Sequence, residues 1–365
     1  MKKNENKILY IVATQYDNLG DLLINKCFLM MLCKYGKVYV DTKNVPNYFK
    51  TFLLKGLANV SELNKEYKTS VKGIGMFTIP FNKSLKFTHV FKSPGPFGAS
   101  VSNKEKVKSF MFYWVYYLFS KKGGKGYFVG NDYIINSKFD LDLLKKYNSL
   151  LEGIYVRSES NLKEITSYGF DRVEYIPDMC FALNSTRQNN STRNKISVSF
   201  RDLENDEWDG KLRENIHCML QFFSKQNKEI EFFFQVDRDR SYNKRLFDLF
   251  KAEFPSIKFR NEVINWDTIN YYENVEYTIS NRLHVLLLGQ NFGVIPIAIL
   301  NNSPKTKKIK SIYNSIQLSS LIYDNISDQD LTFLGENQQN ILEKIQSVNK
   351  KQYQLIETKF DGIFC

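Results

Sequence analysis

The segment Glu276–Leu300, EYTISNRLHVLLLGQNFGVIPIAIL, is the most informative part of the sequence about the fold. It begins with a β-type run, Tyr277–Ile279, turns at a polar corner, and continues as an apolar helix over Leu283–Leu288. Glycines loosen the end of this helix, and Val294–Leu300 has the apolar pattern of a buried strand. Strand, helix and strand form a βαβ unit, which binds ligands outside the carboxyl end of its first strand, at the helix N-terminus.

The residues of the corner suit an anion. Ser280 is expected to cap the helix, which places Arg282, Leu283 and His284 in or beside its first turn. Free backbone N–H groups there already favour negative charge. The structural alternative is that Arg282 pairs with a carboxylate of the protein and His284 packs in the core.

Length and composition limit the protein class. The chain has 365 residues, 43% of them hydrophobic and 25% charged, which is typical of a soluble globular protein large enough for two domains. Its net charge of +12 favours anionic partners. Because the excess is spread out, with no Arg-rich arm and no zinc-finger spacing, nucleic acid is not an expected partner.

A polar stretch without periodicity, 184–194, predicts a linker. The expected domains are therefore 1–185 and 195–330, followed by a C-terminal helix in 331–365 that could pack back across both. Strands alternate with helices on both sides of the linker. This pattern predicts an α/β fold with mainly parallel sheets, as two Rossmann-like domains facing a cleft.

The cysteines and the N-terminal residues indicate a cytoplasmic protein. The five cysteines have no framework spacing and read as free thiols of a reducing compartment. The start, MKKNENKILYIVA, has an apolar run too short for a signal peptide, and reads as a leader entering a first strand.

The opening resembles a Rossmann unit, with a strand at 7–13, a helix at 22–35 and a strand at 38–41. Its first loop lacks G-x-G-x-x-G, so a dinucleotide is not expected. In that loop Asn18, Gly20 and Asp21 could bind a sugar hydroxyl, or cap the helix.

Two other strand ends in the first half carry candidate site residues. A strand from His89 runs into a turn containing Gly95, and Arg157 directly follows the strand 153–156. An arginine at a strand end can bind a carboxylate or phosphate as a fork. A structural pair between Arg157 and Asp178 is the alternative. Ser160 is expected to cap the next helix.

An aromatic run, SFMFYWVYYLF at 109–119, lies between lysine clusters. It is too short to span a bilayer, which takes about 20 apolar residues. A buried helix with flanking lysines is the favoured interpretation. The other is an interfacial helix on anionic lipid, which would make the protein peripheral on the inner face of the plasma membrane.

The second half offers further charged candidates. Asp237-Arg238-Asp239 is expected to be a solvated turn, and no metal is assigned to it. In the basic stretch 302–310, Lys305 and Lys308 either face the cleft or belong to a solvated loop.

Four motifs together resemble the polysaccharide pyruvyl transferase family: NLGD at 18–21, YVRSES at 155–160, YIPD at 175–178 and SNRLH at 280–284. The match extends through G-x-x-P-I-A-I at 293–299, and Gly95 lies where the family has a glycine-rich turn. The chain departs from the family's G-Q-S-x-G-P-like turn at 130–135, where it reads GNDYII.

The resemblance implies a GT-B-like fold and transfer of a pyruvyl group from phosphoenolpyruvate to sugar hydroxyls. The product would be a ketal on a capsule, O-antigen or exopolysaccharide, or on a lipid-linked oligosaccharide precursor. Arg157 and Arg282 would bind the donor, with Ser280, Leu283, Lys305 and Lys308 beside it, and His284 would act as general acid or base.

The same resemblance assigns Asn18, Gly20, Asp21, Gly95 and Asp178 to the acceptor side. No cofactor and no metal are expected, since arginine can neutralise a departing phosphate. Two alternatives stay open: a glycosyltransferase that uses a sugar nucleotide on the same fold, and a non-catalytic module that binds an anion or a glycan.

Overall fold

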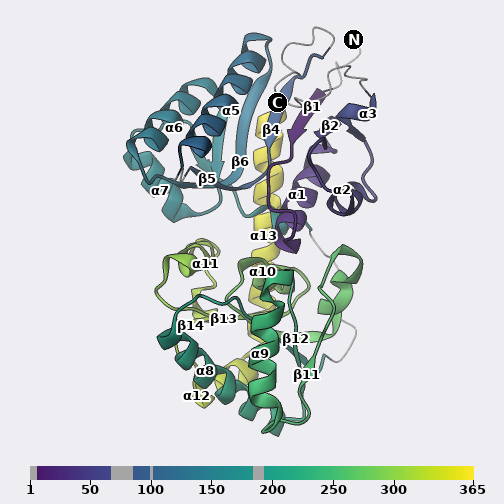
Figure 1. The fold of residues 1–365 in the computed structure, drawn as a ribbon, viewed down its shortest axis with the longest axis vertical. Coiled ribbons are helices and arrows are strands. Elements are labelled where there is room, and N and C mark those ends of the chain that lie inside the picture. The colour runs from purple at the N-terminus through teal and green to yellow at the C-terminus, as the bar shows by residue number, and fades with distance from the viewer. Residues whose placement is uncertain (1–5, 67–84, 99–101, 184–192) are drawn as a thin grey trace. The chain divides into compact units, whose positions relative to one another are not determined.

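The computed structural model describes residues 6–66, 85–98, 102–183 and 193–365. It divides into two compact units (Figure 1). Unit 1 comprises Met1–Tyr16, Ile24–Ala182 and Leu355–Cys365, and unit 2 comprises Asp17–Leu23 and Leu183–Gln354. The linker expected at 184–194 falls mostly outside the described residues.

Unit 1 is built on a parallel sheet with the strand order β3-β2-β1-β4-β6-β7-β8, and β5 pairs with β6. Its strands are β1 (Asn6–Ile11), β2 (Gly36–Asp41), β3 (Val60–Glu62), β4 (His89–Lys92), β5 (Gly95–Gly98), β6 (Lys125–Ile134), β7 (Gly153–Val156) and β8 (Val173–Tyr175). Its helices are α1 (Leu19–Leu32, whose first turn belongs to unit 2), α2 (Asn47–Leu54), α3 (Leu63–Glu66), α5 (Asn103–Lys121), α6 (Lys138–Leu150), α7 (Glu159–Ser167) and the 3-10 helix η2 (Met179–Leu183).

Unit 2 repeats the pattern with a parallel sheet of order β11-β10-β9-β12-β13-β14. Its strands are β9 (Lys195–Ser199), β10 (Glu229–Phe232), β11 (Lys258–Phe259), β12 (Val275–Ser280), β13 (Ile295–Ile299) and β14 (Ile322–Tyr323). Its helices are α8 (Asp206–Lys225), α9 (Arg240–Lys251), α10 (Leu283–Asn291), α11 (Pro304–Ser315), α12 (Asp328–Glu336) and α13 (Gln338–Phe364), with 3-10 turns at Asp237–Asp239, Trp266–Asn274 and Ser319–Leu321. The parallel α/β architecture expected from the sequence is confirmed.

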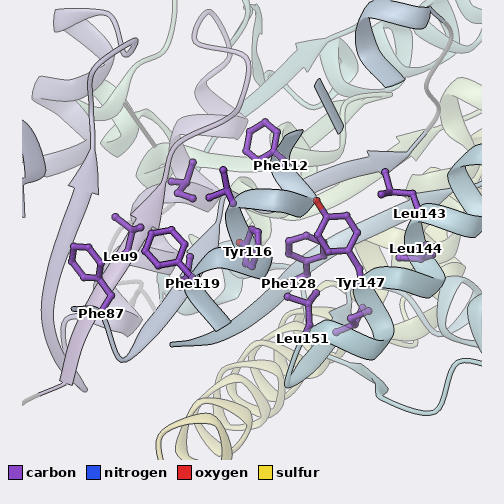
Figure 2. Close-up of a cluster of buried hydrophobic side chains, with 14 of the residues drawn as sticks. Leu9, Phe87, Phe112, Tyr116, Phe119, Phe128, Leu143, Leu144, Tyr147 and Leu151 are labelled. Carbon is purple, nitrogen blue, oxygen red and sulfur yellow. The ribbon is translucent and has the colours of Figure 1, made fainter. Parts of the chain in front are cut away.

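The core of unit 1 lies between the sheet and helices α5 and α6, where aromatic rings interlock (Figure 2). Phe128 of β6 packs edge-on against Tyr116 of α5, with ring centroids 5.2 Å apart, and at a tilt against Tyr147 of α6, with centroids 4.8 Å apart. Such aromatic pairs add to the free energy gained by burying their apolar surface. The core therefore fixes α5 against the sheet by one of its faces.

Three local expectations are wrong. Residues 130–134 form no turn: β6 continues through them with a bulge after Val129, because its backbone pairs with both β5 and β7. The cap of α7 is Ser158, which accepts the N–H of Asn161, and not Ser160. The basic stretch after β13 is no loop, since Pro304–Ser315 is helical.

Helix α13 contributes to both units, as residues up to Gln354 belong to unit 2 and those from Leu355 to unit 1. In unit 2, Asn349 exchanges two hydrogen bonds with Gln290. In unit 1, Phe360 packs edge-on against Phe28, and Phe364 stacks on Tyr35.

The buried His89, at the start of β4, should make the free energy of unfolding decrease at acidic pH. Burial and the nearby Lys125 lower its pKa to about 4, and its ring packs against Phe364. A histidine whose pKa is lower in the folded protein than in the unfolded chain makes the free energy of unfolding depend on pH. This free energy falls as the pH drops from the unfolded pKa, near 6.5, to the folded pKa, because the unfolded chain binds the proton first. We expect a loss on the order of 3 kcal/mol between pH 6.5 and pH 4.

His89→Phe keeps a ring in this aromatic cluster and removes the titration. Urea denaturation at several pH values should then show a shallower loss of stability below pH 6.5. The exposed His217, changed to Gln, is the control. Identical pH profiles for wild type and His89→Phe would contradict this assignment.

Candidate functional site

A cavity of about 90 Å³ opens in unit 2 at the carboxyl ends of β9 and β12. Because a water molecule needs roughly 10–15 Å³ of such space, the cavity can hold a small ligand group. Six of the predicted site residues line it: Asn18, Asp21, Arg282, Leu283, His284 and Lys308. Leu283 and His284, the first two residues of helix α10, line the cavity, so it lies at the place predicted from the βαβ pattern.

Ser280 builds the corner and does not cap the helix. It is fully buried as the last residue of β12, and its hydroxyl donates to the carbonyl of Ser199 in the neighbouring strand. The same oxygen accepts the N–H of Arg282 at 2.9 Å. The N-cap residue of α10 is Arg282, whose side chain makes no capping hydrogen bond. The predictions that Ser280 caps the helix or contacts the donor are therefore wrong, because its buried hydroxyl instead connects β12 to β9.

Two asparagines hold the end of β9 in place. Asn281 accepts the N–H of Arg201 at 2.7 Å and donates to its carbonyl at 2.9 Å. Asn243 makes the same pair of bonds with Phe200, both at 2.8 Å. Both side chains are buried, so their hydrogen bonds are costly to break. Arg201 is thereby fixed at the cavity, beside Arg282.

Arg282 is held by Asp239. The guanidinium Nη2 donates to the Asp239 carboxylate, and Nε is buried without a hydrogen-bond partner among the described residues. Burial lowers the pKa of Arg282 and raises that of Asp239. The solvated turn expected at 237–239 is confirmed for Asp237 and Arg238, which are exposed in a 3-10 turn, and is wrong for Asp239, which is buried. The structural alternative, a carboxylate partner for Arg282, is therefore confirmed, while Arg282 still lines the cavity.

His284 lies against the NLGD loop. A Cβ added to Gly20 would lie 2.3 Å from His284 Nδ1 and 2.7 Å from its Cβ, so only glycine permits this approach. Asn18 accepts the N–H of Gly20 at 2.9 Å, which confirms its capping role. An isolated bridge between Asn18 and Val236 joins the loop to the residues after β10. Two motifs far apart in the sequence therefore meet at one cavity.

Arg157 does not present a free fork. It is 2% exposed, and its guanidinium binds Asp132 through Nε and Nη2 and Asp178 through Nη1. Burial opposes its charge, but the two carboxylates more than offset this and raise its pKa. The predicted free guanidinium is wrong, and the alternative, a structural pair between Arg157 and Asp178 inside unit 1, is confirmed.

Breaking this buried network should destabilise the protein. Arg157→Met leaves the buried Asp178 and the partly buried Asp132 without their cation, and removing one partner of a buried pair costs about 3–5 kcal/mol. Urea denaturation measures the change. The exposed pair Arg240–Asp237 is the control, and Arg240→Met should cost less than about 1 kcal/mol. Equal effects of the two substitutions would contradict a structural role for Arg157.

The remaining predicted residues take up varied positions. Gly95 is buried in β5 with φ of 132°, and its carbonyl accepts from Asn131 at 2.9 Å. A left-handed φ of this kind favours glycine, so the residue shapes the strand. Lys308 lies on α11 and lines the cavity. The side chain of Lys305 lies outside the described residues.

Four polar lining residues were not predicted from the sequence: Arg201, Gln235, Asp239 and Asn281. Arg201 had a signal, because it follows a strand that pairs with β12, and parallel strands end at the same edge. No pattern in the sequence indicated that Asp239 is buried. Within the described ranges, no cluster of three or more His, Cys, Asp or Glu could hold a metal ion.

Solved structures with this fold are two-domain GT-B enzymes. UDP-GlcNAc 2-epimerase from Neisseria meningitidis bound to UDP-GlcNAc has a TM-score of 0.58 at 10% identity, covering 98% of both chains. The UDP-GlcNAc 2-epimerase from Methanocaldococcus jannaschii has a TM-score of 0.54 at 13% identity, covering 95% of this chain and 92% of that one. A UDP-glucosyltransferase from Polygonum tinctorium has a TM-score of 0.55 at 9% identity, covering 100% of this chain and 99% of that one. At these identities the likeness establishes the GT-B-like fold alone.

Sequence comparison identifies the family. No curated protein matches the chain significantly. The family profile for polysaccharide pyruvyl transferase matches residues 18–303, from the NLGD loop through β13. This range contains all four motifs and every described residue placed at the cavity except Lys308 and Ile309. The chain belongs to the polysaccharide pyruvyl transferase family and is a transferase.

Proposed function

We propose that the protein transfers a pyruvyl group from phosphoenolpyruvate to two hydroxyls of a sugar, forming a ketal during synthesis of a cell-surface polysaccharide. One observation carries the proposal: Arg201, Arg282, His284 and Lys308 line the same cavity at the N-terminus of α10. A cation-rich cavity at a helix N-terminus is suited to a small anion.

The donor has two anionic groups, a carboxylate and a phosphate, and it calls for two cationic forks. Arg282 provides one, oriented by Asp239. Arg201 provides the second guanidinium, in the role that the sequence had suggested for Arg157. No carboxylate of the described residues forms an ion pair with Arg201, whereas Arg282 is paired with Asp239. Lys308 adds a third positive charge at the cavity, and the phosphate would bind near the first turn of α10.

The reaction needs two proton movements. One sugar hydroxyl attacks C2 of the donor while C3 gains a proton and becomes a methyl group. The C2–O bond to phosphate then breaks, the second hydroxyl attacks C2, and its proton leaves with the phosphate. Two C–O bonds form, one C–O bond breaks, and the two hydroxyl protons end on the methyl group and on inorganic phosphate.

His284 is placed to move one of these protons. Imidazole can donate or accept a proton near neutral pH, and His284 lines the cavity next to the arginines. Gly20 packs against its ring and holds its position. We assign Asn18 and Asp21, on the same loop, to acceptor hydroxyls, because amide and carboxylate groups bind sugar hydroxyls through hydrogen bonds.

We further propose that catalysis needs no divalent metal, since two arginines and a helix N-terminus can neutralise the departing phosphate. Turnover should therefore persist in a chelator. The acceptor is a glycan or a lipid-linked oligosaccharide, and the reaction would occur in the cytoplasm. None of the five cysteines forms a disulfide among the described residues, which supports that compartment.

A sugar-nucleotide transferase is the second candidate, because the solved structures with this fold include a UDP-glucosyltransferase. In that case the same arginines would bind a diphosphate. Both candidates use the cavity, so only the identity of the donor separates them. A non-catalytic binding module would bind a donor without turning it over.

Ligand-induced stabilisation tests the donor site. Phosphoenolpyruvate should raise the melting temperature of the wild type, since a ligand that binds the native state stabilises it. Arg201→Met and Arg282→Met should lose most of this shift. Arg213→Gln, which alters an exposed arginine on α8, is the control and should keep it. A shift with UDP-sugars and none with phosphoenolpyruvate would overturn the proposed donor.

A further inference from the structure

Helix α5 is apolar on two opposite faces. Phe112, Val115, Tyr116 and Phe119 are buried and belong to the core of unit 1 (Figure 2). The favoured expectation of a buried aromatic helix is therefore correct for this face only. A helix that is apolar all round normally has protein on every side.

The other face is exposed. Val107 is 60% exposed, Phe110 38%, Met111 44% and Trp114 47%. Their spacing of three, four and seven residues places them on one stripe along the helix, which we call the α5 stripe. The remaining exposed large apolar residues of the described chain occur singly on separate elements, which is ordinary for a protein surface. A continuous exposed stripe instead indicates an interaction surface.

Lysines surround the α5 stripe. Residues 103–122 contain five lysines and one carboxylate, Glu105. That carboxylate is occupied in the capping box with Ser102, at the start of the helix. Lys121 lies over the ring of Tyr117 at 5.4 Å, and Lys146 of α6 lies over Phe110 at 5.6 Å. The apolar stripe therefore has a cationic rim at both ends and along one side.

We propose that the α5 stripe inserts into the interface of an anionic lipid bilayer, with the lysines contacting the lipid phosphates. Val107 to Trp114 spans about 10 Å along the helix, and Lys104 to Lys121 about 25 Å, so a helix lying in the membrane plane presents both features together. Exposed Trp and Phe beside Lys is the composition of interfacial helices. No helix among the described residues is long and apolar enough to cross a bilayer.

Charge favours a bilayer over a second copy of this chain. Two copies joined through the α5 stripe would bring two cationic rims together, on molecules that each carry a net charge of +12. An anionic bilayer offers both an apolar layer and negative charge. The inference does not rest on the proposed reaction, because lipid binding can be measured without donor or acceptor.

Vesicle flotation tests the proposal with the full-length protein. Vesicles of phosphatidylcholine with phosphatidylglycerol should carry the wild type, and vesicles of phosphatidylcholine alone should not. The double variant Phe110→Ser/Trp114→Ser should bind at least tenfold more weakly, roughly the loss expected from removing two inserted aromatic side chains. Leu249→Ser/Phe333→Ser, which removes two apolar residues of unit 2 that are more exposed than Phe110 and Trp114, is the matched control and should bind normally.

The lysines are tested in the same way. Lys104→Gln/Lys121→Gln should weaken binding by about fivefold per lysine, and added salt should weaken it further. Lys350→Gln/Lys351→Gln, on the exposed side of α13, is the control for lost charge and should lower binding much less. Wild-type fluorescence should shift to the blue on anionic vesicles. Trp114→Phe should bind and lose that shift.

Three results would overturn the proposal: no flotation, equal flotation on neutral and anionic vesicles, or equal losses in the α5 variants and their controls. Concentration-dependent dimerisation that Phe110→Ser/Trp114→Ser abolishes would assign the α5 stripe to a second copy instead. Phosphate release from phosphoenolpyruvate in detergent-free solution is a separate readout, so failure of lipid binding and failure of the proposed reaction can be told apart.

Discussion

His284→Gln should lower turnover by about 10²–10⁴-fold while phosphoenolpyruvate still raises the melting temperature. General acid–base help is typically worth that factor, and the anion would still be held by Arg201 and Arg282. Glutamine retains hydrogen-bonding capacity but cannot carry the proton. Phosphate release under saturating donor measures turnover, and thermal unfolding with and without donor measures binding.

The matched control is His217→Gln, because His217 lies on α8 at the surface and bonds to Glu253. It should keep wild-type turnover. A His284→Gln variant with full activity would remove the residue from the chemistry. Loss of donor binding in parallel with turnover would make His284 a binding residue.

Gly20→Ala should lower turnover nearly as much as replacing His284. The new Cβ would lie 2.3 Å from Nδ1 and 2.7 Å from both Cβ and Cγ of His284. Since Cβ atoms have no rotamer by which to move away, the loop or the start of α10 must shift. A displacement near 1 Å at a reacting group costs about 10²-fold in rate. We expect at least that loss in phosphate release, with a lower melting temperature.

Gly210→Ala is the control for the added methyl group. Gly210 lies within α8, and a Cβ there would meet nothing within 4 Å. Alanine stabilises a helix interior by up to about 1 kcal/mol relative to glycine, so this variant should be active and no less stable. Wild-type turnover in Gly20→Ala would show that the NLGD loop does not position His284.

The sequence predicted the strand–helix–strand unit because its apolar periodicity is strong and its corner is polar. β12, α10 and β13 lie where the pattern placed them, and Arg282 and His284 line one cavity. Motif order also gave the family. These features are local, and local patterns can be read from one chain.

The interaction partners of individual side chains could not be predicted from the sequence in the same way. Whether Arg157 is free or paired depends on Asp132, which lies in a bulged strand that the sequence suggested was a turn. The approach of Gly20 to His284 joins residues that only the fold brings together. For α5, the apolar pattern gave a helix but could not tell which of its faces the protein covers.

The product of the reaction distinguishes a pyruvyl transferase from a glycosyltransferase. Purified protein is incubated with phosphoenolpyruvate and a panel of acceptor sugars in a chelator, and products are identified by mass spectrometry while phosphate is assayed. We predict an acceptor heavier by one pyruvyl ketal, with one phosphate released for each ketal formed and no product from His284→Gln. An acceptor heavier by one hexose, formed only when a sugar nucleotide is supplied and accompanied by a nucleotide diphosphate, would contradict the account.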